Sequence, residues 1–157
     1  GSMDDVVIGY YRSLLKEDFP HAGEIVNPSV FVEAVGERLI NCGNTGNYMQ
    51  LYLRVADHRI DDIRYLCSCE PAANVAVEVL CTLVKGRMLD EAATLTEESF
   101  FQWVGSREES FARKVRGILA LFHEALIRCR NSGDEQGADR KEGLVDGQLT
   151  WDRSYSA

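Results

Sequence analysis

The chain has 157 residues, of which 45% are hydrophobic and 27% charged, and its formal net charge is −8. This length and composition predict one globular domain without a membrane span, because no run of 18 or more apolar residues occurs. The excess of 25 acidic over 17 basic residues argues against nucleic-acid binding, which needs clustered lysine and arginine.

The start of the chain, residues 1–3, has the composition of a tag remnant, and no signal peptide follows it. Five cysteines occur without a secretion signal. An odd number of cysteines in this context predicts free thiols in a reducing, cytoplasmic compartment, with metal or redox chemistry as the alternative.

The first predicted element is a helix over residues 5–15, where apolar residues recur at helical spacing before Pro20. Residues 18–47 are rich in glycine and asparagine and read as a long connection. Within it, Val30 to Val35 form a short apolar piece. Its pattern fits a helical turn and an edge strand equally.

From Tyr48 the apolar period becomes two, which is typical of a strand. Residues 49–55 alternate in this way, and a second alternating run ends at Cys67 and Cys69 after a polar turn over 56–59. Two such runs joined by a short polar link predict an antiparallel hairpin. Cys67 and Cys69 are then expected on one face of the second strand, together with Tyr65.

The next element is a helix that starts at Pro71, where a missing N–H costs nothing, and stops at Gly86. Its apolar residues surround the whole circumference, which predicts a buried helix laid across the sheet. Two short helices are expected at about 88–95 and 97–104.

A last helix is predicted from the Ser106–Glu109 stretch, which matches a capping box. One apolar stripe runs along it, made of Phe111, Val115, Ile118, Leu119, Phe122, Leu126 and Cys129.

These elements predict an α+β fold, a two-layer sandwich in which a small antiparallel sheet of two to three strands carries helices on one face. Residues 4–130 are expected to form this single domain. Residues 131–157 are polar without a usable period, which predicts a mobile tail.

The sequence from Ile60 to Gly86, with the following Leu89-Asp90-Glu91-Ala92, resembles the centre of the IscU / NifU amino-terminal family of iron–sulfur cluster assembly scaffolds. The resemblance implies the same two-layer fold. It also implies a carrier rather than an enzyme, which accepts sulfur from a cysteine desulfurase, holds a labile cluster of the two-iron two-sulfur type, and passes it to apo-protein acceptors.

Three cysteines hold the nascent cluster in that family: at the first strand, just before the long helix, and near the start of the last helix. A gapless alignment places Thr45, Glu70 and Arg116 at these positions. Cys42 lies three residues before the first position, and Cys69 one residue before the second. The order of elements matches that of the family, but none of the three ligand positions holds a cysteine in this sequence.

The resemblance therefore implies a displaced cluster site made of Cys42, Cys67 and Cys69, with Glu70 or a second protomer of a homodimer supplying the remaining ligand. Iron in such clusters is bound by soft thiolates, and zinc accepts the same donors. The competing interpretation of Cys67 is a small apolar residue on the core face of the sheet.

Three functions stay open on the sequence. The first is a cluster scaffold, the second an interaction module that keeps the fold without a cluster, and the third a zinc or persulfide thiol protein for sulfur transfer. Cys81 and Cys129 are predicted to pack in the core. The histidines are predicted to be solvated or structural: His21, His58 and His123.

Overall fold

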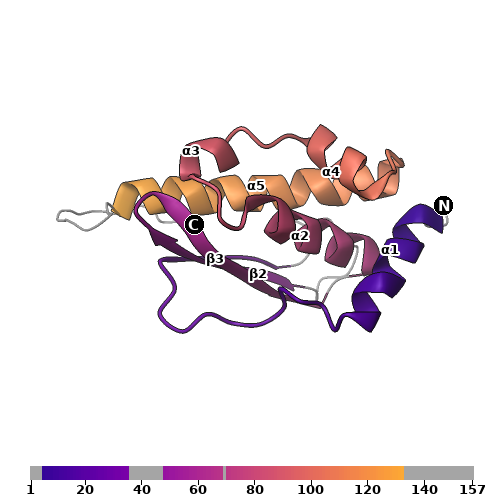
Figure 1. Ribbon diagram of the computed structural model, residues 1–157, viewed down its shortest axis with the longest axis horizontal. Helices are drawn as coiled ribbons and strands as arrows, with labels where there is room; N and C mark the ends of the chain where they lie inside the picture. The colour runs from indigo at the N-terminus through magenta and orange to yellow at the C-terminus, as the bar shows by residue number, and fades with distance from the viewer. Residues whose placement is uncertain (1–4, 36–47, 69, 133–157) are drawn as a thin grey trace. The chain divides into compact units, whose positions relative to one another are not determined.

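The computed structural model describes residues 5–35, 48–68 and 70–132 (Figure 1). The chain divides into two compact units, residues 1–125 and 126–157. The elements are α1 (Asp5–Lys16), β1 (Val30–Val35), β2 (Tyr48–Ala56), β3 (Arg59–Cys67), α2 (Pro71–Val84), α3 (Leu89–Ala92), α4 (Glu97–Val104) and α5 (Glu109–Ser132). A single domain over residues 4–130 stays a prediction, and the expected tail beyond Ser132 lies outside the described residues.

The three strands form one antiparallel sheet in the order β1-β2-β3. The short apolar piece from Val30 to Val35 is therefore an edge strand and not a helical turn. Its residues pair with β2 from Val30–Leu53 to Val35–Tyr48, and this pairing satisfies backbone groups that a lone helical turn would leave open. The predicted hairpin of β2 and β3 is confirmed.

One face of the sheet is buried. In β2 the inward residues Met49, Leu51 and Leu53 have no exposed surface, while their neighbours are half-buried. A bulge between Arg54 and Val55 ends this alternation, so Val55 is only half-buried, although the period placed it on the inner face.

The hairpin turn lies at residues 56–59 as expected, with Ala56 paired to Arg59 and two residues between them. Asp57 and His58 both have positive φ, 53° and 64°. Two consecutive left-handed residues make the turn type whose twist matches that of the flanking strands.

On the buried side of the sheet α2 packs next to β3, and α1 lies beside α2 at the end of the sheet (Figure 1). As predicted, α2 is apolar on nearly every side and begins with proline. It is followed by Gly86 at φ 85°, a conformation that glycine adopts readily. Within the described parts of the chain, no helix is long and apolar enough to cross a membrane.

The start of α5 differs from the predicted capping box. The helix begins at Glu109, and the carboxylate of Glu108 accepts the backbone N–H of Ser110 at 3.0 Å. Ser106 lies too early to cap the helix, and its hydroxyl accepts the N–H of Glu108 instead. The predicted apolar stripe is buried along its full length.

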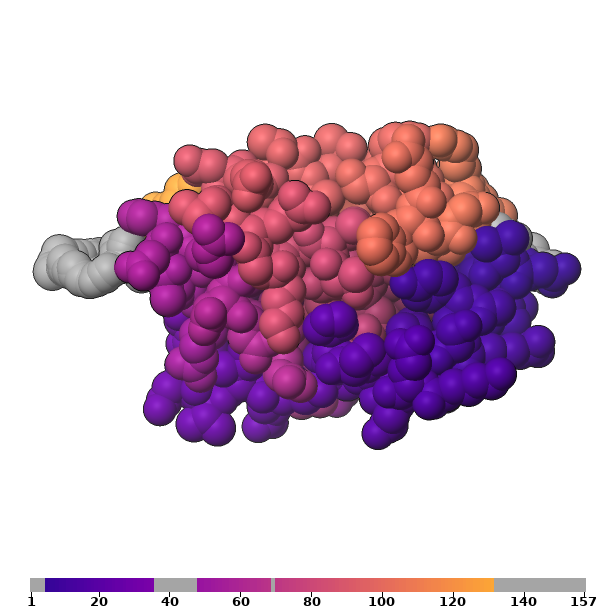
Figure 2. Space-filling model, viewed as in Figure 1, coloured from indigo at the N-terminus to yellow at the C-terminus, as the bar shows by residue number. Residues whose placement is uncertain are grey.

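The chain after α1 closes the outer edge of β3. Ala22 forms a parallel bridge with Tyr65, and the backbone N–H of Gly23 donates to the Tyr65 carbonyl at 2.8 Å. The indole N–H of Trp103 in α4 donates to the hydroxyl of Tyr10 in α1 at 2.8 Å, where the orange and indigo surfaces meet in Figure 2. The N-terminal segment is thus hydrogen-bonded both to the edge of β3 and to α4.

Candidate thiol site at the end of the sheet

Cys67 is the last residue of β3 and lies opposite Met49 of β2. As predicted, it shares the face of Tyr65, and it is half-buried. Val35 and Tyr48, which flank residues 36–47, pair with each other at this same end of the sheet. Cys42 and Cys69, the other two predicted ligands, lie outside the described residues.

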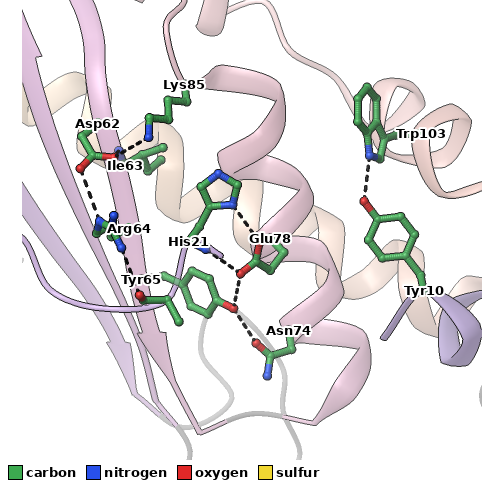
Figure 3. A network of polar contacts seen from close by, with 11 residues as sticks. Tyr10, His21, Asp62, Ile63, Arg64, Tyr65, Asn74, Glu78, Lys85 and Trp103 are labelled. Atoms are coloured by element: carbon green, nitrogen blue, oxygen red, sulfur yellow. Dashed lines mark hydrogen bonds and ion pairs between the residues drawn. The ribbon is translucent and has the colours of Figure 1, made fainter. Parts of the chain in front are cut away.

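A network of polar side chains, Tyr65, Asn74, Glu78 and His21, lies between β3 and α2 (Figure 3). The Cys67 sulfur lies 3.4 Å from Oδ1 of Asn74 in α2. The Tyr65 hydroxyl lies 3.1 Å from the same oxygen and 2.9 Å from Oε2 of Glu78. The network therefore links Cys67 to Glu78, a buried acid four residues, or about one helical turn, after Asn74.

Glu78 is only 1% exposed, and its carboxylate accepts three hydrogen bonds. The Tyr65 hydroxyl gives one. His21 gives two, from its backbone N–H to Oε2 at 3.1 Å and from Nδ1 to Oε1 at 2.8 Å. Because a buried carboxylate is costly without donors, this pairing explains how an acid stands in the most apolar helix of the fold.

The partnership of His21 and Glu78 is absent from the sequence prediction. The available signal was Glu78 itself, an acid in a helix otherwise apolar on all sides. His21 has the predicted structural role. Its partner lies 57 residues away, and no local pattern identifies it.

Burial raises the pKa of Tyr65, and the nearby Glu78 carboxylate raises it further. Tyr65 therefore keeps its proton at any physiological pH and acts as a hydrogen-bond donor. Burial likewise raises the pKa of the fully buried Cys81 thiol well above its usual value. An uncharged, inaccessible thiol fits the predicted packing role of Cys81. Cys129 is buried as well.

Glu70 precedes Pro71 at the N-terminal end of α2, and its carboxylate makes no capping hydrogen bond. Its Oε2 lies 3.8 Å from Nζ of Lys114 in α5, a lysine that is 5% exposed. An ion pair thus joins Glu70, at a position where the family resemblance implies a cluster ligand, to α5. The charged Lys114 would disfavour a cation beside it.

Among the described residues, no three histidine, cysteine or acidic side chains lie close enough together to hold a metal ion. Cys67 supplies the soft donor that iron and zinc favour, and Glu70 supplies a hard one. Cys42 and Cys69 as further ligands stay predictions.

A half-buried thiol thus lies at one end of the three-stranded sheet of a small α+β domain, beside the start of a buried helix. The chain belongs to the NifU-like N terminal domain family, which matches residues 21–124. This membership confirms the predicted resemblance.

Solved structures with the same fold include a candidate iron–sulfur cluster assembly scaffold protein for the SUF system from the thermophile Fervidobacterium islandicum AW-1. The two chains are 13% identical with a TM-score of 0.57, over 79% of this chain and 96% of that one. The N-terminal part of a nitrogen-fixing NifU-like protein from Brucella abortus is 15% identical with a TM-score of 0.46, over 78% and 79%. The first likeness confirms the predicted fold class. No curated protein sequence matches this chain.

Proposed function

We propose that this protein is an iron–sulfur cluster assembly scaffold that holds a labile cluster and passes it to apo-protein acceptors. The observation that carries the proposal is the position of Cys67, half-buried at the end of β3 in a NifU-like domain. The flanks of the segment that contains Cys42 pair at the same end, and Cys69 follows two residues later in the sequence.

In this proposal the cluster is cargo, held by the thiolates of Cys42, Cys67 and Cys69. Thiolates suit iron because both are soft, and they must be deprotonated to bind. Glu70 or a second protomer would supply the remaining ligand. A two-iron two-sulfur cluster needs four ligands, and a cysteine desulfurase would supply its sulfur. The protein would act as a cytoplasmic carrier rather than as an enzyme.

The second candidate is an interaction module that keeps the fold and a partner surface without a cluster. The contact between Glu70 and Lys114 favours it, because Glu70 occupies one of the positions where the family resemblance implies a thiolate and is paired with a lysine instead. A fold can persist in this way after its chemistry is lost.

Anaerobic reconstitution with iron, sulfide and a reductant separates the two candidates. For the scaffold we expect visible charge-transfer bands that disappear in Cys42→Ser, Cys67→Ser and Cys69→Ser. The matched control is Cys81→Ala, a core cysteine that should keep the bands. A folded wild type that stays colourless would reject the scaffold and leave the interaction module.

A further inference from the structure

The hydrogens available in the polar network next to Cys67 decide which way the side-chain amide of Asn74 is turned. The Tyr65 hydroxyl carries one hydrogen, which cannot be donated both to Glu78 and to Asn74. Oε2 of Glu78 accepts the backbone N–H of His21 at 3.1 Å, and it lies 2.9 Å from the Tyr65 oxygen, closer than Oδ1 of Asn74 at 3.1 Å. We therefore assign the Tyr65 hydrogen to the shorter bond, the one to Glu78.

The remaining contact then brings two acceptors together. With its hydrogen directed to Glu78, the Tyr65 oxygen would face Oδ1 of Asn74 at 3.1 Å with no hydrogen between them. A half-turn of the Asn74 amide exchanges Oδ1 and Nδ2, which have nearly the same shape. After this turn Nδ2, which carries two hydrogens, occupies the place of Oδ1, 3.1 Å from the Tyr65 oxygen and 3.4 Å from the Cys67 sulfur.

We propose that Asn74 is a positioning residue that donates an N–H to the Cys67 sulfur, held in that orientation by Tyr65 and Glu78. Such a donor stabilises a negatively charged sulfur, whether it is a free thiolate or a metal-bound one. The inference deepens the proposed scaffold function, since it assigns to the residues behind Cys67 the task of preparing it as a ligand or sulfur acceptor.

The orientation of the amide has a direct spectroscopic test in the apo-protein. In ¹⁵N-labelled wild type, the Asn74 side-chain amide protons should show NOEs to the Cys67 Hβ protons and to the Tyr65 ring. The opposite orientation points both amide protons away from these groups. NOEs missing from both residues would overturn the assignment, and this measurement needs no substitution that could affect folding.

The chemical consequence is tested by the rate at which iodoacetamide labels Cys67, followed by peptide mass spectrometry at one fixed pH. Asn74→Leu keeps the approximate shape and removes the donor, so we expect labelling about tenfold slower. If Asn74 instead accepts the thiol hydrogen, the same variant labels faster. A faster or unchanged rate would therefore reject the proposal.

Two controls make the rate test specific. Gln102→Leu removes an amide from an exposed position of α4 and should leave the Cys67 rate unchanged. Cys81 in the same digests should stay unlabelled, which shows that each variant is folded. Both tests use the protein without iron. The hydrogen bond from Asn74 can therefore be confirmed even if reconstitution gives no cluster, and failure of one proposal does not imply failure of the other.

Discussion

Glu78 is the single residue whose surroundings most determine the candidate site. A carboxylate that is 1% exposed would destabilise the fold without donors, so His21 and Tyr65 are required partners rather than incidental neighbours. The same carboxylate orients the Tyr65 hydroxyl. One residue therefore couples the stability of α2 to the chemistry behind Cys67.

A double-mutant cycle measures the strength of this coupling. We expect His21→Ala to lower the free energy of unfolding by about 1–3 kcal/mol, because it removes the Nδ1 donor from a buried carboxylate. In the Glu78→Leu background the same change should cost much less, since no charge is left unpaired. Urea denaturation of the four proteins gives the coupling energy.

The matched control is a cycle on Glu98 and Arg107, an ion pair of two exposed side chains. Solvent screens such a pair, so its coupling energy should be the smaller of the two. Equal coupling in both cycles would contradict the role assigned to the His21–Glu78 pair.

At the scale of the elements, α2 is packed on nearly every side, and ten of its 14 residues are buried: Ala72, Ala73, Val75, Ala76, Val77, Glu78, Val79, Leu80, Cys81 and Val84. It covers the inner face of the sheet and carries both Asn74 and Glu78. The packing of α2 against the sheet therefore both buries its apolar side chains and positions the two polar residues of the candidate site.

Truncation of one α2 residue tests this dependence. Leu80→Ala leaves a cavity in the core and should lower the free energy of unfolding by about 2–5 kcal/mol. Leu15→Ala in α1 is the matched control, because this leucine is 52% exposed, and its effect should stay within about 0.5 kcal/mol. Thermal or urea unfolding compares them. Similar losses would mean that α2 is packed less tightly than the structure shows.

At the scale of the whole molecule, ligand binding is linked to stability. A metal that binds only the folded protein raises Tm, and at a free concentration of 100 times Kd the gain is about 2.7 kcal/mol. Zinc is a suitable probe because it accepts thiolate ligands without redox chemistry.

We expect zinc to raise the Tm of the wild type and of Cys81→Ala under reducing conditions, and to have little effect on Cys67→Ser. Calorimetry of the three proteins with and without zinc gives the shifts. A wild type whose Tm does not respond to zinc would argue against the thiolate site and for the interaction module.

The limits of sequence reasoning are visible in particular elements. The hairpin, α2 and the face that Cys67 shares with Tyr65 follow from periods of two and 3.6 residues, which a short window contains. Six residues from Val30 to Val35 are too few to separate a strand from a helical turn. The predicted cap of α5 was wrong because the capping-box match at Ser106 is only a local pattern, whereas the helix opens with the bond from the Ala112 N–H to the Glu108 carbonyl.

The sequence by itself determined the β2–β3 hairpin, the buried helix α2, the family and the candidate thiol Cys67, because each is recorded in local spacing or in contiguous motifs. Only the tertiary structure decided that His21 pairs with Glu78 and that Glu70 pairs with Lys114. The physical reason is that a charge removed from water needs a partner in space. Which residue supplies it depends on how distant elements pack.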